Sequence, residues 1–299
     1  MIKPPFAFAG HKLKLMDKIL PIIMATMKKF NYSFFFEPFF GSGTVMINLL
    51  NYLDTHEEVT HSIESFSASE INPRICQIHR DIKEKPEEFL QDIRTYYSSI
   101  NSKEDYKAFI TESNNNPPNG ARSFIMHHFA FFGRVHYDKD YHFSSSFHMP
   151  SKDNEKKKLN FEELETRTRR ISHLYNKYNV IIFNNSYDEM EKPSDTLLYI
   201  DPPYAGTSGY STIRFDFDAF DDWLDEHNDY IISTFKHYYI PKPSINYKVI
   251  VPKTITAKTG KMGAKRMEFL RVVHPSIVKG CEIEDIKNIE EHLYLMMQK

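Results

Sequence analysis

The chain has 299 residues, of which 41% are hydrophobic and 26% charged, and its formal net charge is −2; these values are typical of a globular protein with a sizeable core. It contains no run of about 18 apolar residues that would predict a membrane-spanning helix, and its first residues lack the apolar core of a secretory signal. Cys76 and Cys281 are the only cysteines, too few for a disulfide framework or a cysteine-based zinc site, which favours a reducing, cytoplasmic location.

The first third of the chain predicts the start of an α/β sheet. Apolar residues at helical spacing run over 11–29, and a short buried strand is expected at 33–36. A helix over 44–53, a strand over 62–69 and a helix that opens near Pro73 follow. This order of strand, loop, helix and strand is typical of an open sheet flanked by helices.

A loop with two glycines joins the first strand to the next helix. It reads EPFFGSG and contains Gly41 and Gly43, where the lack of a Cβ lets a ligand approach the backbone closely. The third glycine of a dinucleotide fingerprint is missing and no G-K-S/T follows, so the pattern does not indicate a phosphate-binding loop. The alternative is an ordinary tight turn.

Glu70 closes the second predicted strand, in the sequence SASEIN. An acid at this place in a nucleotide-binding sheet accepts hydrogen bonds from the ribose hydroxyls. At the start of a helix the same acid would instead interact favourably with the helix dipole. With the glycine loop upstream we favour the ribose, and therefore a ligand that has an adenosine-like ribose but no pyrophosphate.

The middle of the chain, from about 84 to 178, has a different pattern. Helical periodicity covers 87–97, 103–113, 121–131 and 159–178, separated by polar loops at 114–120 and 133–158. We interpret this region as an insertion or a second subdomain. Arg134, Tyr137 and Lys139 lie in the second loop, where they predict either contacts with DNA or an ordinary solvated loop.

The sheet then resumes and reaches a rigid motif. Strands are expected at 180–183, 196–200, 230–234 and 247–251, with late strands at 265–273 and 292–297. The strand 196–200 runs into Asp201, Pro202, Pro203 and Tyr204, and because the two prolines cannot continue a sheet ladder the strand must stop there. A rigid strand-ending turn with a surface tyrosine is the alternative to a functional interpretation of this motif.

The motif also fits a particular chemistry. The exocyclic amine of a base is a poor nucleophile because its lone pair is delocalised into the ring. Asp201 and the carbonyl of Pro202 provide two fixed acceptors that turn this lone pair toward an electrophile, by preorganised dipoles and positioning. Tyr204 offers a face on which a flipped-out base can stack.

Positive charge is concentrated late in the chain. Residues 252–267 include Lys258, Lys261, Lys265 and Arg266 and contain no acid, a composition that suits contacts with DNA phosphates; a solvated loop is the alternative. Fourteen histidines are present, but no H-x-x-x-H with a nearby acid occurs, so we expect no metal site.

Several motifs, in the same order, resemble those of Dam-type N6-adenine DNA methyltransferases (D12 class, alpha group). They are PFAFAGHK at 5–12, EPFFGSGTV at 37–45, EIN at 70–72, NSYDEM at 185–190, DPPY at 201–204 and KTGKMGAKRMEFL at 258–270. Two departures stand out. His11 replaces a glycine that the family usually has before its lysine, and the recognition pattern of the family is reduced to FFGR at 131–134.

The resemblance implies the fold and the site. We expect an S-adenosylmethionine-dependent methyltransferase fold, a mixed Rossmann-like sheet flanked by helices, with 1–83 and 180–299 as the catalytic domain and 84–179 as a helical target-recognition region. Asp201, Pro202 and Tyr204 would be catalytic. The cofactor S-adenosyl-L-methionine would be bound by Phe8, Lys12, Glu37, Pro38, Phe39, Gly41, Gly43, Glu70, Ile71, Ser186, Tyr187 and Asp201.

The expected activity is methyl transfer to N6 of a flipped-out adenine at a specific short site in double-stranded DNA, without a metal and without a covalent enzyme intermediate. Asp201 favours adenine, because Asn at this position would suggest a glutamine side chain and Ser would suggest cytosine N4. RNA adenine and a catalytically silent DNA-binding module remain alternatives. We expect a monomer or a weak dimer that does not associate with membranes.

Overall fold

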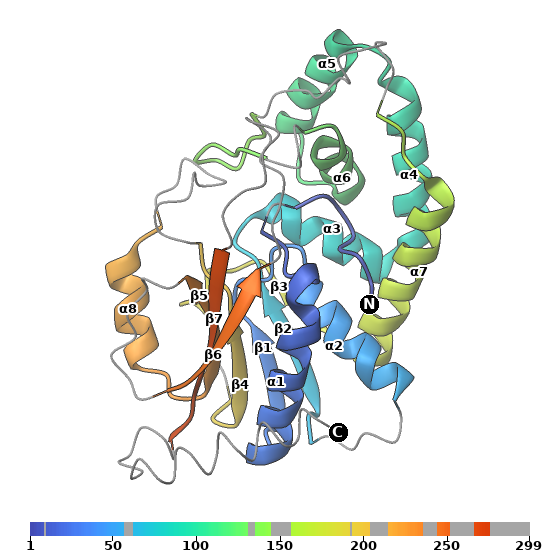
Figure 1. The fold of residues 1–299 in the computed structure, drawn as a ribbon. Helices are drawn as coiled ribbons and strands as arrows, with labels where there is room; N and C mark the ends of the chain where they lie inside the picture. The colour runs from blue at the N-terminus through green and yellow to red at the C-terminus, as the bar shows by residue number, and fades with distance from the viewer. Residues whose placement is uncertain are drawn as a thin grey trace.

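The computed structural model describes residues 1–8, 10–56, 62–130, 135–144, 157–191, 193–203, 215–235, 244–251 and 266–275. Within these ranges the strands are β1 (Phe34–Glu37), β2 (Ser65–Ser69), β3 (Ile181–Phe183), β4 (Thr196–Ile200), β5 (Tyr230–Phe235), β6 (Ile245–Val251) and β7 (Arg266–Val273). A 3-10 turn, η1 (Leu13–Leu15), precedes the helices α1 (Met16–Phe30), α2 (Thr44–Thr55), α3 (Pro73–Glu84), α4 (Pro86–Ser99), α5 (Lys103–Asn114), α6 (Gly120–Phe129), α7 (Phe161–Lys177) and α8 (Phe217–Asp225). Figure 1 shows helices on both sides of a central sheet.

The described strands form one seven-stranded sheet in the order β3-β2-β1-β4-β5-β7-β6. The first five strands of this order pair in parallel, and β7 is antiparallel to both β5 and β6. The chain builds outward from β1 to β3 and then returns to β4 on the other side of β1. The strand order therefore reverses between β1 and β4, and in open α/β sheets ligands bind at such a switch point, outside the carboxyl ends of the strands.

The alternation of side chains along the strands gives the sheet two hydrophobic faces. Phe35 and Leu197 belong to a large core that includes buried residues of α1, α2 and α3. Their chain neighbours Phe36 and Leu198 belong to a smaller core with Phe220 of α8. Since both faces are covered, β1 and β4 are mainly apolar, with the sequences FFFE and TLLYI, as expected for parallel strands.

The helices between residues 84 and 179 continue the large core rather than form one of their own. Buried phenylalanines of α4 and α6, including Phe89, Phe124 and Phe129, belong to the same cluster as Phe35 of β1. In Figure 1, α5 and α6 lie above the sheet, α4 and α7 lie to its right, and α8 lies to its left. The division into a catalytic domain and a target-recognition region stays a prediction.

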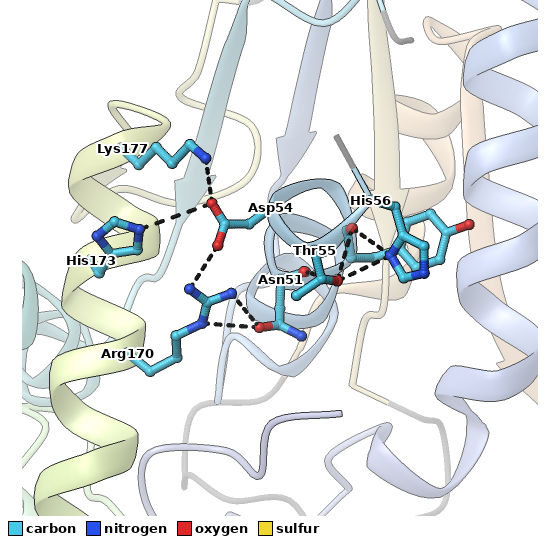
Figure 2. Close-up of polar contacts among 8 residues, drawn as sticks. Asn51, Asp54, Thr55, His56, Arg170, His173 and Lys177 are labelled. Atoms are coloured by element: carbon cyan, nitrogen blue, oxygen red, sulfur yellow. Dashed lines mark hydrogen bonds and ion pairs between the residues drawn. The ribbon is translucent and has the colours of Figure 1, made fainter. Parts of the chain in front are cut away.

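A polar cluster joins α7 to the end of α2 (Figure 2). The carboxylate of Asp54 accepts from Nη1 of Arg170 at 2.6 Å and from Nζ of Lys177 at 2.5 Å. Arg170 also donates to the side-chain oxygen of Asn51, from Nε at 3.1 Å and from Nη2 at 2.8 Å. The hydrogen bond from Lys177 lowers the pKa of Asp54, so the carboxylate stays ionised.

Local signals explain where α3 begins. Asn72 caps α3 by accepting from the backbone N–H of Arg74, with Pro73 in the first turn. The predicted strand over 62–69 is shorter in the structure, where β2 begins at Ser65. The strand expected at 292–297 lies outside the described residues. No helix in the described ranges is both long and apolar enough to cross a membrane.

Candidate active site

The predicted catalytic acid and the predicted glycine loop meet at the switch point. Glu37 ends β1, and Asp201 follows β4, its parallel neighbour. Glu70 follows β2, on the other side of β1. Because the carboxyl ends of parallel strands lie along one edge of a sheet, these three acids share that edge.

Lys12 and Asp201 form an ion pair across this edge, with 2.7 Å between Nζ of the lysine and Oδ2 of the aspartate. The lysine side chain is 4% exposed and the aspartate side chain 21%. A buried ammonium group is stable only if it is paired and hydrogen-bonded, and Nζ of Lys12 also lies 3.4 Å from the carbonyl oxygen of Gly10. The pair thus connects the N-terminal motif to the predicted catalytic motif.

Glu37 lies close to this pair and is buried. Its Oε2 accepts from the backbone N–H of Met46 in the first turn of α2 at 3.1 Å, where a carboxyl group complements the helix dipole. Burial raises the pKa of Glu37, and the charge of Asp201 raises it further while Lys12 and the bond from Met46 lower it. Lys12, Glu37 and Asp201 therefore form one electrostatically linked group.

Both glycines of the loop have left-handed backbone conformations, with φ of 49° at Gly41 and 65° at Gly43. This conformation is unfavourable for other residues. A Cβ on Gly41 would lie 3.1 Å from the ring of Phe8, and one on Gly43 would lie 2.9 Å from Phe40 and from His79. Close packing therefore adds to the requirement for glycine at both positions.

Glu70 is buried and binds the loop. Its Oε2 accepts from the N–H of Gly41 at 2.9 Å, and its Oε1 accepts from the N–H of Asn72 at 2.9 Å. Burial raises the pKa of Glu70 to about 7, although both hydrogen bonds lower it. The next residue, Ile71, is 51% exposed, so an apolar side chain at the surface adjoins a carboxylate that ionises near neutral pH.

The NSYDEM segment lies beside the second core. Tyr187 stacks on Phe39 with 5.1 Å between ring centroids, and it contacts Phe220 and Trp223 edge-on. Burial raises the pKa of Tyr187 to about 12, so the phenol keeps its proton at neutral pH. The backbone N–H of Ser186 donates to the carboxylate of Glu189 at 3.0 Å.

The proline motif is described only in part. Pro38 and Pro202 are buried, while Pro203 is exposed. Tyr204 lies outside the described residues, as do four predicted DNA contacts, Arg134, Lys258, Lys261 and Lys265. Arg266 begins β7. The predicted catalytic set is therefore represented by Asp201 and Pro202 alone.

The two remaining predicted DNA contacts differ in exposure. Lys139 is exposed, as a residue that contacts phosphate must be. Tyr137 is 2% exposed, and its hydroxyl lies 2.8 Å from Nε2 of His127. In this arrangement Tyr137 packs inside the protein. Of these two residues, only Lys139 is exposed enough to contact DNA.

Two buried histidines, both missed by the sequence analysis, hold the predicted cofactor segments. Nε2 of His79 lies 2.9 Å from the carbonyl oxygen of Gly41, and Nδ1 of His127 lies 3.0 Å from that of Ala7. Burial lowers the pKa of each histidine to about 4, so both rings are neutral at neutral pH. The available signal was the position of His79 among Ile75, Ile78 and Ile82 on the apolar face of a helix.

One group of potential metal ligands occurs in the described part of the chain, formed by Asp138, Asp140 and His142. Oδ1 of Asp138 accepts from the backbone N–H groups of Asp140 and His142 at 2.9 and 2.8 Å. Its Oδ2 lies 3.1 Å from Nδ1 of His142. These bonds stabilise a polar turn, and they provide no argument for a metal.

The chain matches one protein family over most of its length. The family model for D12 class N6 adenine-specific DNA methyltransferases matches residues 8–264, which include the glycine loop, Glu70 and Asp201. A comparison with curated proteins finds no match. The mixed sheet flanked by helices agrees with the methyltransferase fold of that family. The chain therefore belongs to the D12 class of N6 adenine-specific DNA methyltransferases.

Proposed function

We propose that the protein transfers a methyl group from S-adenosyl-L-methionine to N6 of a flipped-out adenine at a specific short site in double-stranded DNA. The observation that carries the proposal is the ion pair between Lys12 and Asp201, 2.7 Å long and next to Glu37 at the switch point of the sheet. It joins the proposed cofactor motif to the proposed catalytic motif at the edge where open α/β sheets bind ligands, which supports the proposal. The family match supports the adenine and the DNA.

The residues along the strand ends fit the cofactor. The carboxylate of Glu70 has lone pairs beyond the two that accept from Gly41 and Asn72, and an ionised carboxylate can accept both ribose hydroxyls. The exposed side chain of Ile71 offers apolar area to an adenine ring. Gly41 lets the backbone approach a ligand, and Ser186 and Tyr187 follow β3, the neighbour of β2.

In this proposal the protein promotes the reaction by positioning the adenine amine. Asp201 accepts a hydrogen bond from one N–H of the adenine amine and the carbonyl of Pro202 accepts one from the other, so that the nitrogen lone pair is less delocalised into the ring and points toward an electrophile. S-adenosyl-L-methionine supplies an electrophilic methyl group when it is bound. Lys12 holds the carboxylate of Asp201 in place. Tyr204 stacks on the flipped-out base and so replaces the stacking that the base loses when it leaves the duplex.

Electrostatic attraction to phosphate completes the proposal. Lys139 is exposed on the segment that follows α6, and Lys258, Lys261, Lys265 and Arg266 supply positive charge in the sequence after β6. Such contacts bind the backbone of any DNA and leave the choice of site to base contacts. Arg134 belongs to the same predicted recognition loop as Lys139.

The test is the chemical fate of a labelled methyl group. The protein is incubated with labelled S-adenosyl-L-methionine and either plasmid DNA or RNA of the same sequence, and the products are digested to nucleosides. We expect label in N6-methyladenine from DNA, at adenines that share one short sequence. Label found only in RNA would show that the substrate is RNA and not DNA. DNA binding without any labelled product would indicate a catalytically silent DNA-binding module.

A further inference from the structure

A buried histidine outside the proposed chemistry packs against the glycine loop. His79 of α3 is fully buried, and its Nε2 lies 2.9 Å from the carbonyl oxygen of Gly41. Its ring centroid lies 4.3 Å from that of Phe40. Its Cε1 lies 2.9 Å from the position that a Cβ on Gly43 would take. A single imidazole therefore supports most of the loop that joins β1 to α2.

The hydrogen bonds fix the tautomer of this histidine. A carbonyl oxygen can only accept, so Nε2 of His79 carries the proton. In a neutral ring Nδ1 is then an acceptor, and the hydroxyl of Tyr175, 3.1 Å away, is its donor. Tyr175 is fully buried as well. The carbonyl of Gly41 therefore sets the tautomer, and the hydroxyl of Tyr175 satisfies the ring nitrogen that is left as an acceptor.

The peptide groups on either side of Gly41 are held by different parts of the chain. The N–H donates to Oε2 of Glu70 after β2, and the carbonyl accepts from His79 of α3. A shift of the loop would therefore also move the carboxylate that is expected to bind the ribose. Left-handed φ values at Gly41 and Gly43 leave the loop with few alternatives that keep both bonds.

Tyr175 belongs to α7, a helix that ion pairs attach to the end of α2. On α7, Arg170 and Lys177 bind Asp54 at the end of α2, at 2.6 and 2.5 Å (Figure 2). Since α2 begins at Thr44, directly after the loop, α7 holds this unit at both ends. It holds the loop through Tyr175 and His79, and the end of the helix through Asp54.

We propose that Tyr175 and His79 form a relay that positions the glycine loop for S-adenosyl-L-methionine, so that α7 serves the cofactor site rather than recognition of the DNA target. The inference rests on the proposed function, because it assigns the loop to this cofactor. It differs from the predicted division of the chain, which places α7 in the recognition region 84–179. Both side chains are positioning residues, since they act through the backbone of Gly41.

The first test compares two substitutions that each remove one buried hydroxyl group. Tyr175→Phe breaks the relay. Tyr106→Phe is the matched control, because Tyr106 is also fully buried and donates to the carbonyl of Met126 at 3.1 Å within the helical region. Calorimetry with S-adenosylhomocysteine should give binding at least about fivefold weaker for Tyr175→Phe and within about twofold of wild type for Tyr106→Phe. Equal effects of the two substitutions would contradict the relay.

The second test changes the histidine. His79→Leu removes the donor to Gly41 and should weaken binding of S-adenosylhomocysteine about tenfold or more. His79→Gln should recover part of the loss, because its amide can donate to the same carbonyl. In steady-state assays the KM for the cofactor should rise while the KM for DNA stays near its wild-type value. If His79→Leu does not fold, Tyr175→Phe decides the question, since it removes a single oxygen atom.

The results separate the two proposals. If the wild-type chain does not bind S-adenosylhomocysteine, both the proposed cofactor and the relay are wrong. If the wild-type chain binds S-adenosylhomocysteine, and Tyr175→Phe and His79→Leu both bind it with wild-type affinity, only the relay is wrong. A rise in the KM for DNA with unchanged cofactor affinity would also contradict the relay, and would indicate that α7 takes part in target recognition.

Discussion

Nζ of Lys12 lies 2.7 Å from Oδ2 of Asp201, in a pair whose lysine is almost completely buried. The lysine comes from the N-terminal segment and the aspartate follows β4, so the contact exists only in the folded chain. We expect the pair to fix the carboxylate before a substrate binds. Preorganised acceptors of this kind avoid the cost of reorganisation during the reaction.

The first prediction concerns this lysine. Lys12→Met should lower the rate of methyl transfer at saturating substrates by about 100-fold, because it leaves Asp201 without the cation that orients it. Lys12→Arg should retain more activity, since a guanidinium can also bind a carboxylate. Single-turnover rates provide the measurement.

The control is Lys3→Met, in the same segment. Lys3 is 64% exposed and pairs with Glu163 at 2.8 Å, and exposed pairs contribute little. A loss of rate as large for Lys3→Met as for Lys12→Met would show that the segment as a whole, and not the ion pair, matters.

The second prediction concerns pH. Burial raises the pKa of Glu70 to about 7, and ribose hydroxyls require the ionised carboxylate as acceptor. As pH rises from 6 to 8 the ionised fraction increases about tenfold, and affinity for S-adenosylhomocysteine should increase by a similar factor. Calorimetry at several pH values measures it.

Glu70→Gln is the reference for that experiment. The amide has no charge to lose, so the part of the pH dependence that comes from Glu70 should disappear while any contribution of the ligand remains. The sign for stability is opposite. Because the folded pKa exceeds the usual value, ionisation of Glu70 should cost stability as pH rises from about 4.5 to 7, and Glu70→Gln should reduce that loss.

The third prediction tests the anchor of α7 shown in Figure 2. Asp54→Asn should lower the free energy of unfolding by about 1 kcal/mol, because it weakens the pairs with Arg170 and Lys177. The pKa of Asp54 is lowered, chiefly by Lys177, so this stabilisation is present at neutral pH and is lost as pH falls through the folded pKa.

A double-mutant cycle isolates the interaction. Urea unfolding of Asp54→Asn, Lys177→Met and the combined variant should reveal a coupling energy. The same cycle on Lys3 and Glu163, whose side chains are 64% and 45% exposed, should give a value near zero. Additive effects of the two substitutions would show that Asp54 and Lys177 do not anchor α7 to α2.

The fourth prediction concerns binding to DNA. Lys139→Ala, Lys261→Ala and Lys265→Ala should each weaken binding to all sequences alike and reduce the slope of log affinity against log salt by about 1. Lys28→Ala serves as control, because Lys28 is exposed near the end of α1, which leads into the opposite end of β1. An unchanged slope would show that the substituted lysine does not contact phosphate.

Local sequence patterns predicted the fold well. The strand over 196–200 was predicted with its observed ends, because the prolines after Asp201 stop it and a buried apolar run precedes them. Helix α8 was missed, although its signals were present. Asp216 caps it by accepting from the N–H groups of Asp218 and Ala219, and Phe220, Trp223 and Leu224 have helical spacing.

Contacts between distant segments were beyond sequence reasoning. The motifs placed Lys12 and Asp201 in one site by resemblance, but only the fold brings them into contact. His79 was missed because its partners, Gly41 and Tyr175, come from other elements and no local pattern links them. Tyr137 looked like a loop residue that contacts DNA, because the sequence does not reveal that its ring packs against Phe143 and His127.

The most direct test of the central claim is the single-turnover rate of methyl transfer to DNA by wild type and Asp201→Ala. We predict that Asp201→Ala binds S-adenosylhomocysteine and DNA measurably but transfers no methyl group, because the amine has lost its acceptor. Transfer by this variant at the wild-type rate would contradict the mechanism.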